Sequence, residues 1–297
     1  MDTSDLAKRM KEYYEGIPKT KLMRRCPVAI RLDGKAFHTF TKGFNKPFDE
    51  ILIKSMQETM KYLCENIQGC VLGYTQSDEI TLILVDYKKL NSSAWFDYEV
   101  QKMCSVAASM ATMAFNQIFS INIHMIMSHV HYGQDFDYTV LKNDYGLTDN
   151  DLKYDSEFWN KRLETYQRKI GTAMFDARCF NIPKEEVTNL IYWRQLDATR
   201  NSIQMVGQAN FSHNELQHVN CNMIKDMLMK YKNINWDELP VYQQRGSCCI
   251  RNHMICEPYG NRMLTNEAPD DHWFIDKEIP IFKDEGREYV EKLINFD

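Results

Sequence analysis

The chain has 297 residues, 44% of them hydrophobic and 26% charged, which is typical of a globular protein with one large or two small domains. Its net charge of −5 argues against a protein that binds nucleic acid over its whole surface, but it allows a local basic face. The charged N-terminus lacks a signal-peptide pattern and no run of 18 apolar residues predicts a membrane span. Nine scattered cysteines indicate reduced thiols, so we expect a cytoplasmic location.

Apolar runs bounded by turn residues predict the elements of the first half of the chain. Asp49 is a suitable N-cap for one of the helices, because its carboxylate can accept hydrogen bonds from free backbone N–H groups. The predicted elements, in chain order, are a helix over residues 3–15, a strand over 27–32 that ends on Asp33-Gly34, a helix over 50–67, strands over 70–75 and 80–85, and a long helix over 93–119.

The second half begins with a mixed polar and aromatic stretch, residues 131–170, which we interpret as an insertion that contains a helix near its end. Ser212 and Glu215 stand at the spacing of a capping box. The remaining predicted elements are a strand over 173–182, a helix from 183 to about 208, a helix from the Ser212 cap to 230, and then short strands and loops. This order predicts an α+β fold with a mainly antiparallel sheet.

Two acidic corners stand at predicted strand ends, 45 positions apart. Asp33 closes the first strand, and Asp78 and Glu79 lie in the turn of the predicted hairpin. Carboxylates at the ends of neighbouring strands can hold a pair of Mg²⁺ ions for phosphoryl transfer. The alternative is that these are ordinary turn residues, since Asp-Gly and Ser-Asp favour turns.

Other polar residues have both a functional and a plain structural interpretation. Lys46 and Ser77 could contact a triphosphate, or they could be a surface lysine and a turn serine. The Arg194, Asp197, Arg200 and Asn201 side chains fall roughly on one helix face, which is either solvated or in contact with phosphate.

The spacing of the cysteines near the C-terminus indicates a structural role, and the histidines also have a plain structural interpretation. Zinc-competent residues gather near the C-terminus but lack a CxxC spacing, so a strand with buried thiols is the better interpretation. These residues are Cys248, Cys249, His253 and Cys256. No phosphate-binding glycine loop and no GxSxG elbow occurs in the chain. Three histidines, His38, His124 and His213, could each belong to the core.

Five motifs in the same order resemble the tRNA-His guanylyltransferase family, whose members extend RNA in the 3′-to-5′ direction. The most specific are RLDGKAFHTF at residues 31–40 and YTQSDE at 74–79. The others are KPFD at 46–49, FDAR at 175–178 and WRQLD at 193–197.

The resemblance implies a polymerase-palm-like fold and a two-Mg²⁺ site. The implied metal ligands are Asp33, the backbone carbonyl of Gly34, and Asp78, with Glu79 as an auxiliary carboxylate. The implied nucleotide contacts are Lys46, Ser77, Lys102, Lys35 and His38. It also implies a homotetramer built as a dimer of dimers. We accordingly predict a palm-like catalytic domain over residues 1–130 and 171–257, an insertion over 131–170 and a C-terminal extension over 258–297.

The chain departs from the eukaryotic pattern after residue 197. A run tied to recognition of the histidine tRNA, C-H-I-N-N-L-Y-N in those enzymes, is A-T-R-N-S-I-Q-M here, which resembles a bacterial and viral branch of the family. We therefore expect a metal-dependent nucleotidyltransferase that uses ATP or GTP to add nucleotides to the 5′ end of a tRNA, either a 5′-truncated tRNA or tRNA-His. The alternatives are a palm-fold nucleotide cyclase or dinucleotide synthase, and a non-catalytic protein that binds RNA ends.

Overall fold

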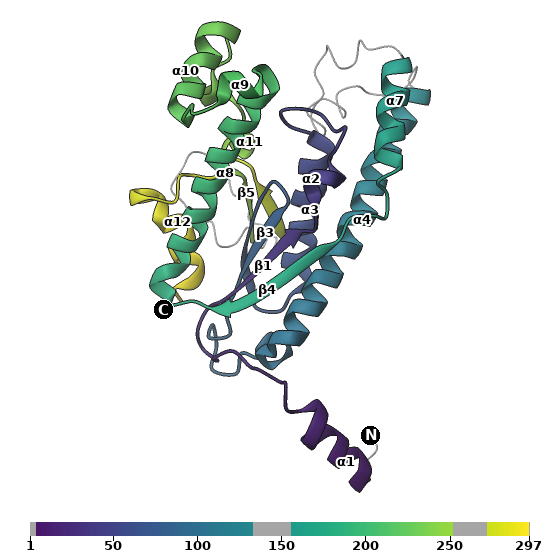
Figure 1. Ribbon diagram of the computed structural model, residues 1–297. Helices are drawn as coiled ribbons and strands as arrows, with labels where there is room; N and C mark the ends of the chain where they lie inside the picture. Colours follow the sequence, from purple (N-terminus) through teal and green to yellow (C-terminus); the bar gives the residue numbers. More distant parts are fainter. Residues whose placement is uncertain (1–3, 133–155, 252–271, 297) are drawn as a thin grey trace, which may run out of the picture.

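A six-stranded antiparallel sheet forms the centre of the fold in the computed structural model, which describes residues 4–132, 156–251 and 272–296 (Figure 1). The strand order is β4-β1-β3-β2-β5-β6. The strands are β1 (Val28–Gly34), β2 (Cys70–Gln76), β3 (Glu79–Leu84), β4 (Phe175–Asn181), β5 (Ser247–Arg251) and β6 (Trp273–Asp276). The predicted α+β, palm-like architecture is confirmed.

One face of the sheet is covered by α3 (Glu50–Asn66) and α4 (Val100–Tyr132), and α7 (Ser156–Gln167) packs against α4. Alternate residues of β1, such as Ile30 and Leu32, point into this layer and meet Phe115 and Phe119 of α4 in one buried cluster. By length and composition alone, α4 could cross a membrane over Val100–Ser128, which our search for apolar runs did not predict. Its buried stripe packs on the sheet side, as in a core helix.

The opposite face is covered only in part, by α8 (Val187–Asn210) and α12 (Glu288–Ile294). Ala29 of β1 and Ile83 of β3 are buried there with Ile191 of α8. Towards the other end of the strands, β4 carries the exposed side chains of Asp176 and Arg178 on this same face. The α8 side of the sheet is therefore open where β1 ends.

A small helical unit extends from the C-terminal half of α8 (Figure 1). It contains α9 (His213–Leu216), α10 (Cys221–Lys232), a short 3₁₀ turn over Trp236–Glu238 and α11 (Val241–Arg245). Trp236 is buried in it and donates from Nε1 to the Ser202 hydroxyl of α8 at 3.0 Å. At the opposite end of the molecule, α1 (Asp5–Met10) and the turn after it, Lys11–Glu15, project from the body with no buried residue (Figure 1).

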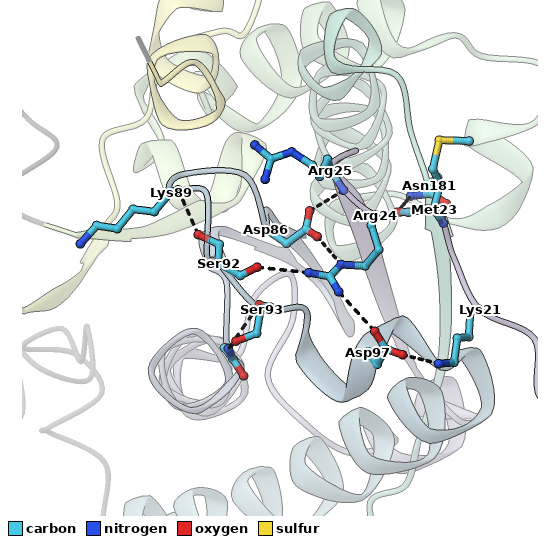
Figure 2. Close-up of polar contacts among 11 residues, drawn as sticks. Lys21, Met23, Arg24, Arg25, Asp86, Lys89, Ser92, Ser93, Asp97 and Asn181 are labelled. Atoms are coloured by element: carbon cyan, nitrogen blue, oxygen red, sulfur yellow. Dashed lines mark hydrogen bonds and ion pairs between the residues drawn. The ribbon is translucent and has the colours of Figure 1, made fainter.

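A network of charges fixes the end of the sheet that lies far from Gly34 (Figure 2). Arg24 donates from Nε to the buried carboxylate of Asp86 at 2.6 Å, and the backbone N–H of Arg25 donates to the same carboxylate at 2.8 Å. Asp97 pairs with both Lys21 and Arg24. These contacts hold residues 21–25 against the segment before α4.

The predicted strands and most helices are confirmed within a few residues, and three predictions were wrong. The long helix spans Val100–Tyr132 rather than 93–119, and it begins late because Phe96, Asp97 and Tyr98 all have positive φ. The helix expected over 212–230 is two helices, because His218 has φ +63° and Asn220 caps a new start. The C-terminal region contains the helix α12 as well as β6, and β6 pairs with β5 in the main sheet. Residues 133–155 of the predicted insertion lie outside the described residues.

Candidate active site

The two acidic corners meet at the open end of β1. Asp33 lies opposite Glu79 of β3 and Asp176 of β4, and directly opposed residues of antiparallel strands share a face. Asp78 lies in the β2–β3 turn, and its backbone carbonyl accepts a hydrogen bond from the backbone N–H of Gly34 at 3.0 Å. Asp33 and Asp78 are thus brought to one corner, as the sequence predicted.

Glycine is required at position 34 because a side chain would collide with Phe37. A Cβ built there would lie 2.3 Å from Cδ2 of the Phe37 ring. That ring belongs to α2 (Phe37–Phe40), which begins after Ala36 in a left-handed conformation. The chain therefore turns sharply after Asp33 and leaves the backbone of Gly34 beside the Asp78 turn.

The corner carries negative charge that the chain does not fully neutralise. Burial raises the pKa of Asp33, and the nearby charges of Glu79 and Asp176 raise it further. Burial also raises the pKa of Asp78, against a hydrogen bond from the Ser77 hydroxyl at 3.0 Å that lowers it. Carboxylates whose ionisation is opposed in this way gain stability from a bound cation.

Glu79 is positioned differently from the two aspartates. Both its oxygens are bound by arginines, since the Arg31 guanidinium lies 2.8 Å from Oε2 and Arg194 Nε lies 2.7 Å from Oε1. Glu79 is only 7% exposed, and Arg194 also donates to Asp197 at 2.7 Å. Glu79 therefore ties β1 and β3 to α8, a role that the sequence did not reveal. The interpretation of Arg194 as part of a solvated helix face was wrong, because its side chain is buried.

A divalent ion would fit the corner only with help from the backbone and the substrate. No group of three or more His, Cys, Asp or Glu residues within the described ranges has the geometry of a metal site. Asp33 and Asp78 supply two carboxylates, and the Gly34 backbone lies between them. Mg²⁺ suits such a site because it takes few protein oxygens and keeps positions for water and phosphate.

Three of the residues expected to contact a triphosphate adjoin this corner along the chain. Lys35 and His38 are exposed at the start of α2, directly after Gly34, and Ser77 precedes Asp78 in the β2–β3 turn. Lys46 is exposed in the loop before α3.

The loop that carries Lys46 is fastened by a buried carboxylate. Asp49 caps α3 through the backbone N–H of Leu52 at 3.0 Å, as predicted. It also accepts from the backbone N–H of Asn45 at 2.9 Å and from the Tyr166 hydroxyl at 2.5 Å. Tyr166 belongs to α7, so a helix of the predicted insertion anchors the Lys46 loop, and sequence reasoning missed this residue.

Lys102, a further predicted nucleotide contact, lies away from the corner. Thr112 of α4 accepts from the backbone N–H of Phe175, which pairs with Gly34, so this turn of α4 lies near the carboxylates. Lys102 is ten residues earlier on the same helix, about 15 Å along its axis. Its ammonium group lies 4.9 Å from the centre of the Phe96 ring, towards the far end of the sheet.

The cysteine and histidine predictions had mixed outcomes. Cys248 and Cys249 are fully buried in β5, which confirms a strand with buried thiols. His253 and Cys256 lie outside the described residues. The core placement of His38, His124 and His213 was wrong, because all three side chains are exposed.

Comparison with known proteins agrees with the motifs and the fold. Residues 7–143 match the family model for tRNAHis guanylyltransferase. The tRNA(His) guanylyltransferase of Saccharomyces cerevisiae is 31% identical over 249 residues, which cover 79% of this chain and 86% of the yeast protein. A solved bacterial tRNA(His) guanylyltransferase-like protein in complex with ATP is 38% identical, covers 98% of this chain and 100% of its own, and superposes with a TM-score of 0.72. A bacterial protein of the same description in complex with GTP gives 35% identity, coverage of 98% and 99%, and a TM-score of 0.67. The chain belongs to the tRNA-His guanylyltransferase family of nucleotidyltransferases.

Proposed function

We propose that this protein uses ATP or GTP to add nucleotides to the 5′ end of a tRNA, in the 3′-to-5′ direction and in a metal-dependent reaction. The observation that carries the proposal is the junction of Asp33 and Asp78, which are held together by the Gly34-to-Asp78 backbone hydrogen bond. The raised pKa of both carboxyls supports a cation site at that junction. The solved ATP and GTP complexes of bacterial relatives support nucleotides as substrates.

The chain's own residues supply positioning and electrostatics. Asp33, Asp78 and the Gly34 carbonyl would hold Mg²⁺, which when bound stabilises charge on the attacking and leaving oxygens. Lys46 and Ser77 would hold the triphosphate, which would keep the reacting phosphorus at the corner. Holding the reactants in this way replaces a bimolecular encounter with a reaction inside one complex.

The added base would be chosen by pairing with the 3′ side of the acceptor stem. The protein then needs to grip phosphates rather than read bases, so tRNA binding should weaken with salt. The sequence from Ala198 to Met205, which replaces the run tied to the histidine tRNA, supports repair of several 5′-truncated tRNAs rather than guanylylation of tRNA-His alone.

We also propose that the protein acts in the cytoplasm as a homotetramer. The assembly is supported by the projecting N-terminal segment, on which Leu6, Met10 and Tyr13 are exposed. The location is supported by the free thiols of all cysteines in the described part of the chain. Light scattering on the purified protein would test the assembly, and a monomer would contradict it. Fractionation of the source cells would test the location.

A 5′-extension assay tests the proposed reaction. The purified protein is mixed with Mg²⁺, four nucleoside triphosphates and a tRNA that lacks its first nucleotide and carries a 5′-mono- or triphosphate. We expect template-matched extension that disappears when Mg²⁺ is omitted and in the Asp78→Asn variant. A cyclic or dinucleotide product formed without RNA would support the cyclase alternative instead. Tight RNA binding without any product would support the RNA-end-binding protein.

A further inference from the structure

The Trp193 side chain of α8 stands half-exposed beside the carboxylate corner. It is 52% exposed, although the next two residues, Arg194 and Gln195, are buried. Gln195 fixes this turn of the helix, since its amide donates to the backbone carbonyl of Pro280 at 2.8 Å and accepts from the backbone N–H of Phe282 at 3.0 Å. The indole is therefore carried by a firmly held turn rather than by a loop.

One face of the indole is occupied by arginines. The guanidinium carbons of Arg194 and Arg31 lie 4.3 Å and 5.4 Å from the ring centre. Both guanidiniums bind the same carboxylate, that of Glu79, so they lie close together at the ring. We take the exposed half of the indole surface to be the face turned away from them, and the cation–π contacts hold the ring in place.

The ring is close to the reacting corner and on its α8 side. Arg31 precedes Asp33 by two residues on the same face of β1, about 7 Å along the strand. The Lys46 loop belongs to the other side of the sheet, because Asp49 fastens it to α3, which covers the opposite face, and to α7, which packs against α4. The carboxylates can therefore be approached from two sides, the side of Trp193 and α8 and the side of the Lys46 loop.

A nucleobase fits the open face of the ring. Flat aromatic side chains near positive charge bind unpaired bases by stacking, which contributes about 1–3 kcal/mol per base. Leu196, one helical turn further on, is also half-exposed and continues the apolar surface. Arg178 and Arg200 are exposed nearby on β4 and α8, where they can face phosphates.

Building on the proposed function, we propose that Trp193 stacks against the terminal base of the RNA that is being extended. The incoming nucleotide occupies the other side of the corner, so the stacked base places the RNA 5′ phosphate over Asp33 and Asp78. The interaction requires no particular base, which suits an enzyme that leaves base choice to the template.

The test compares Trp193→Ala and Trp193→Phe with the control variant Met229→Ala, which changes an exposed apolar residue of α10. For Trp193→Ala we expect the KM for 5′-truncated tRNA to rise about 5- to 150-fold, which corresponds to the loss of one stacked base. The KM for ATP should stay unchanged, Trp193→Phe should recover most of the loss, and Met229→Ala should match the wild type.

Three results would overturn the inference. A higher KM for ATP with an unchanged KM for tRNA would assign the ring to the free nucleotide. A change in the molecular mass of the assembly in Trp193→Ala, with both KM values unchanged, would show that the ring contacts another subunit instead of RNA. No change in any of these quantities would leave no role for stacking.

Direct binding separates this inference from the proposed function. The Kd for the truncated tRNA is measured without nucleotide, so it reports stacking whether or not extension occurs. An unchanged Kd in Trp193→Ala would refute stacking on Trp193 even if the enzyme extends tRNA. A higher Kd in this variant of a protein that never extends RNA would support stacking and refute the proposed reaction.

Discussion

Replacing Glu79 with alanine should destabilise the fold far more than replacing Asp176, the carboxylate on the other side of Asp33 in the sheet. The change leaves the buried guanidinium of Arg194 with Asp197 as its remaining partner and removes the carboxylate that pairs with the mostly buried Arg31; the two arginine side chains are 7% and 19% exposed. Removing one partner of a buried ion pair costs about 3–5 kcal/mol, and the remaining Arg194–Asp197 pair and the partial exposure of Arg31 favour the lower end. That is a large share of the roughly 5–15 kcal/mol that stabilises a typical domain.

Asp176→Ala is the matched control for this measurement. Asp176 lies on the same face as Glu79, but its side chain is 57% exposed and its ion pair with Arg178 is at the surface. Exposed pairs contribute about 0–1 kcal/mol, so the control should unfold nearly as the wild type does. Both variants are unfolded in urea and followed by circular dichroism, with Glu79→Gln as an intermediate case that keeps one acceptor oxygen.

The outcome distinguishes two roles for Glu79. If Glu79→Ala unfolds at a much lower urea concentration than Asp176→Ala, the carboxylate is a brace between the sheet and α8. If both variants are equally stable and only Glu79→Ala is inactive, the bracing argument is wrong and Glu79 acts at the reacting atoms, as an auxiliary metal ligand would.

Four further predictions concern the corner and its surroundings. Asp33→Asn and Asp78→Asn should each lose several powers of ten in extension rate while the thermal unfolding temperature at pH 7 without Mg²⁺ stays equal or rises; a large fall would show that the carboxylates are structural. The pKa of both carboxyls is raised in the folded chain, so the folded chain binds more protons than the unfolded chain at the pH values where these carboxyls ionise. The free energy of unfolding of the wild type should therefore fall as pH rises through this range. A double variant that carries both asparagines should show a weaker dependence on pH. Tyr166→Phe removes the hydroxyl that donates to Asp49, so it should cost about 1.5–3 kcal/mol and raise the KM for nucleotide; an unchanged KM would separate the Lys46 loop from nucleotide binding. If Lys102 binds nucleotide at the corner of another subunit, mixed oligomers of the Lys102→Ala and Asp78→Asn variants should have activity that neither variant has alone. Mixed oligomers without activity would contradict that arrangement.

The parts of the fold that depend on neighbouring residues could be predicted from the sequence. The β1 and hairpin strands follow from short apolar runs, and the Asp49 cap and the Ser212 to Glu215 capping box are local hydrogen-bond patterns that the structure contains. The corner itself was predictable because Asp33 and Asp78 both stand at strand ends, where a hairpin and its neighbour bring side chains together.

The remaining features depend on contacts between distant segments. Glu79 and Arg194 are separated by 115 positions, and only packing of α8 on the sheet shows that they pair. Periodicity alone made Arg194 appear solvated, because it cannot distinguish a polar helix face in water from one that meets a buried carboxylate. The link between Tyr166 and Asp49 was hidden for the same reason, since α7 returns to the core 117 positions after the residue it anchors.

The same distant contacts give the site two distinct sides. On one side, α7 and α3 hold the Lys46 loop through Asp49, and on the other, α8 holds Trp193 through Arg194 and Gln195. Extension at a 5′ end has to bring two separate substrates, an RNA terminus and a nucleotide, to the same phosphorus. A corner approached from two independently braced sides meets that requirement, because each substrate can be positioned without displacing the other. The braces also account for the charge left at Asp33 and Asp78, which have no ion pair among the described residues, since Glu79, the buried carboxylate beside them, is neutralised by Arg31 and Arg194.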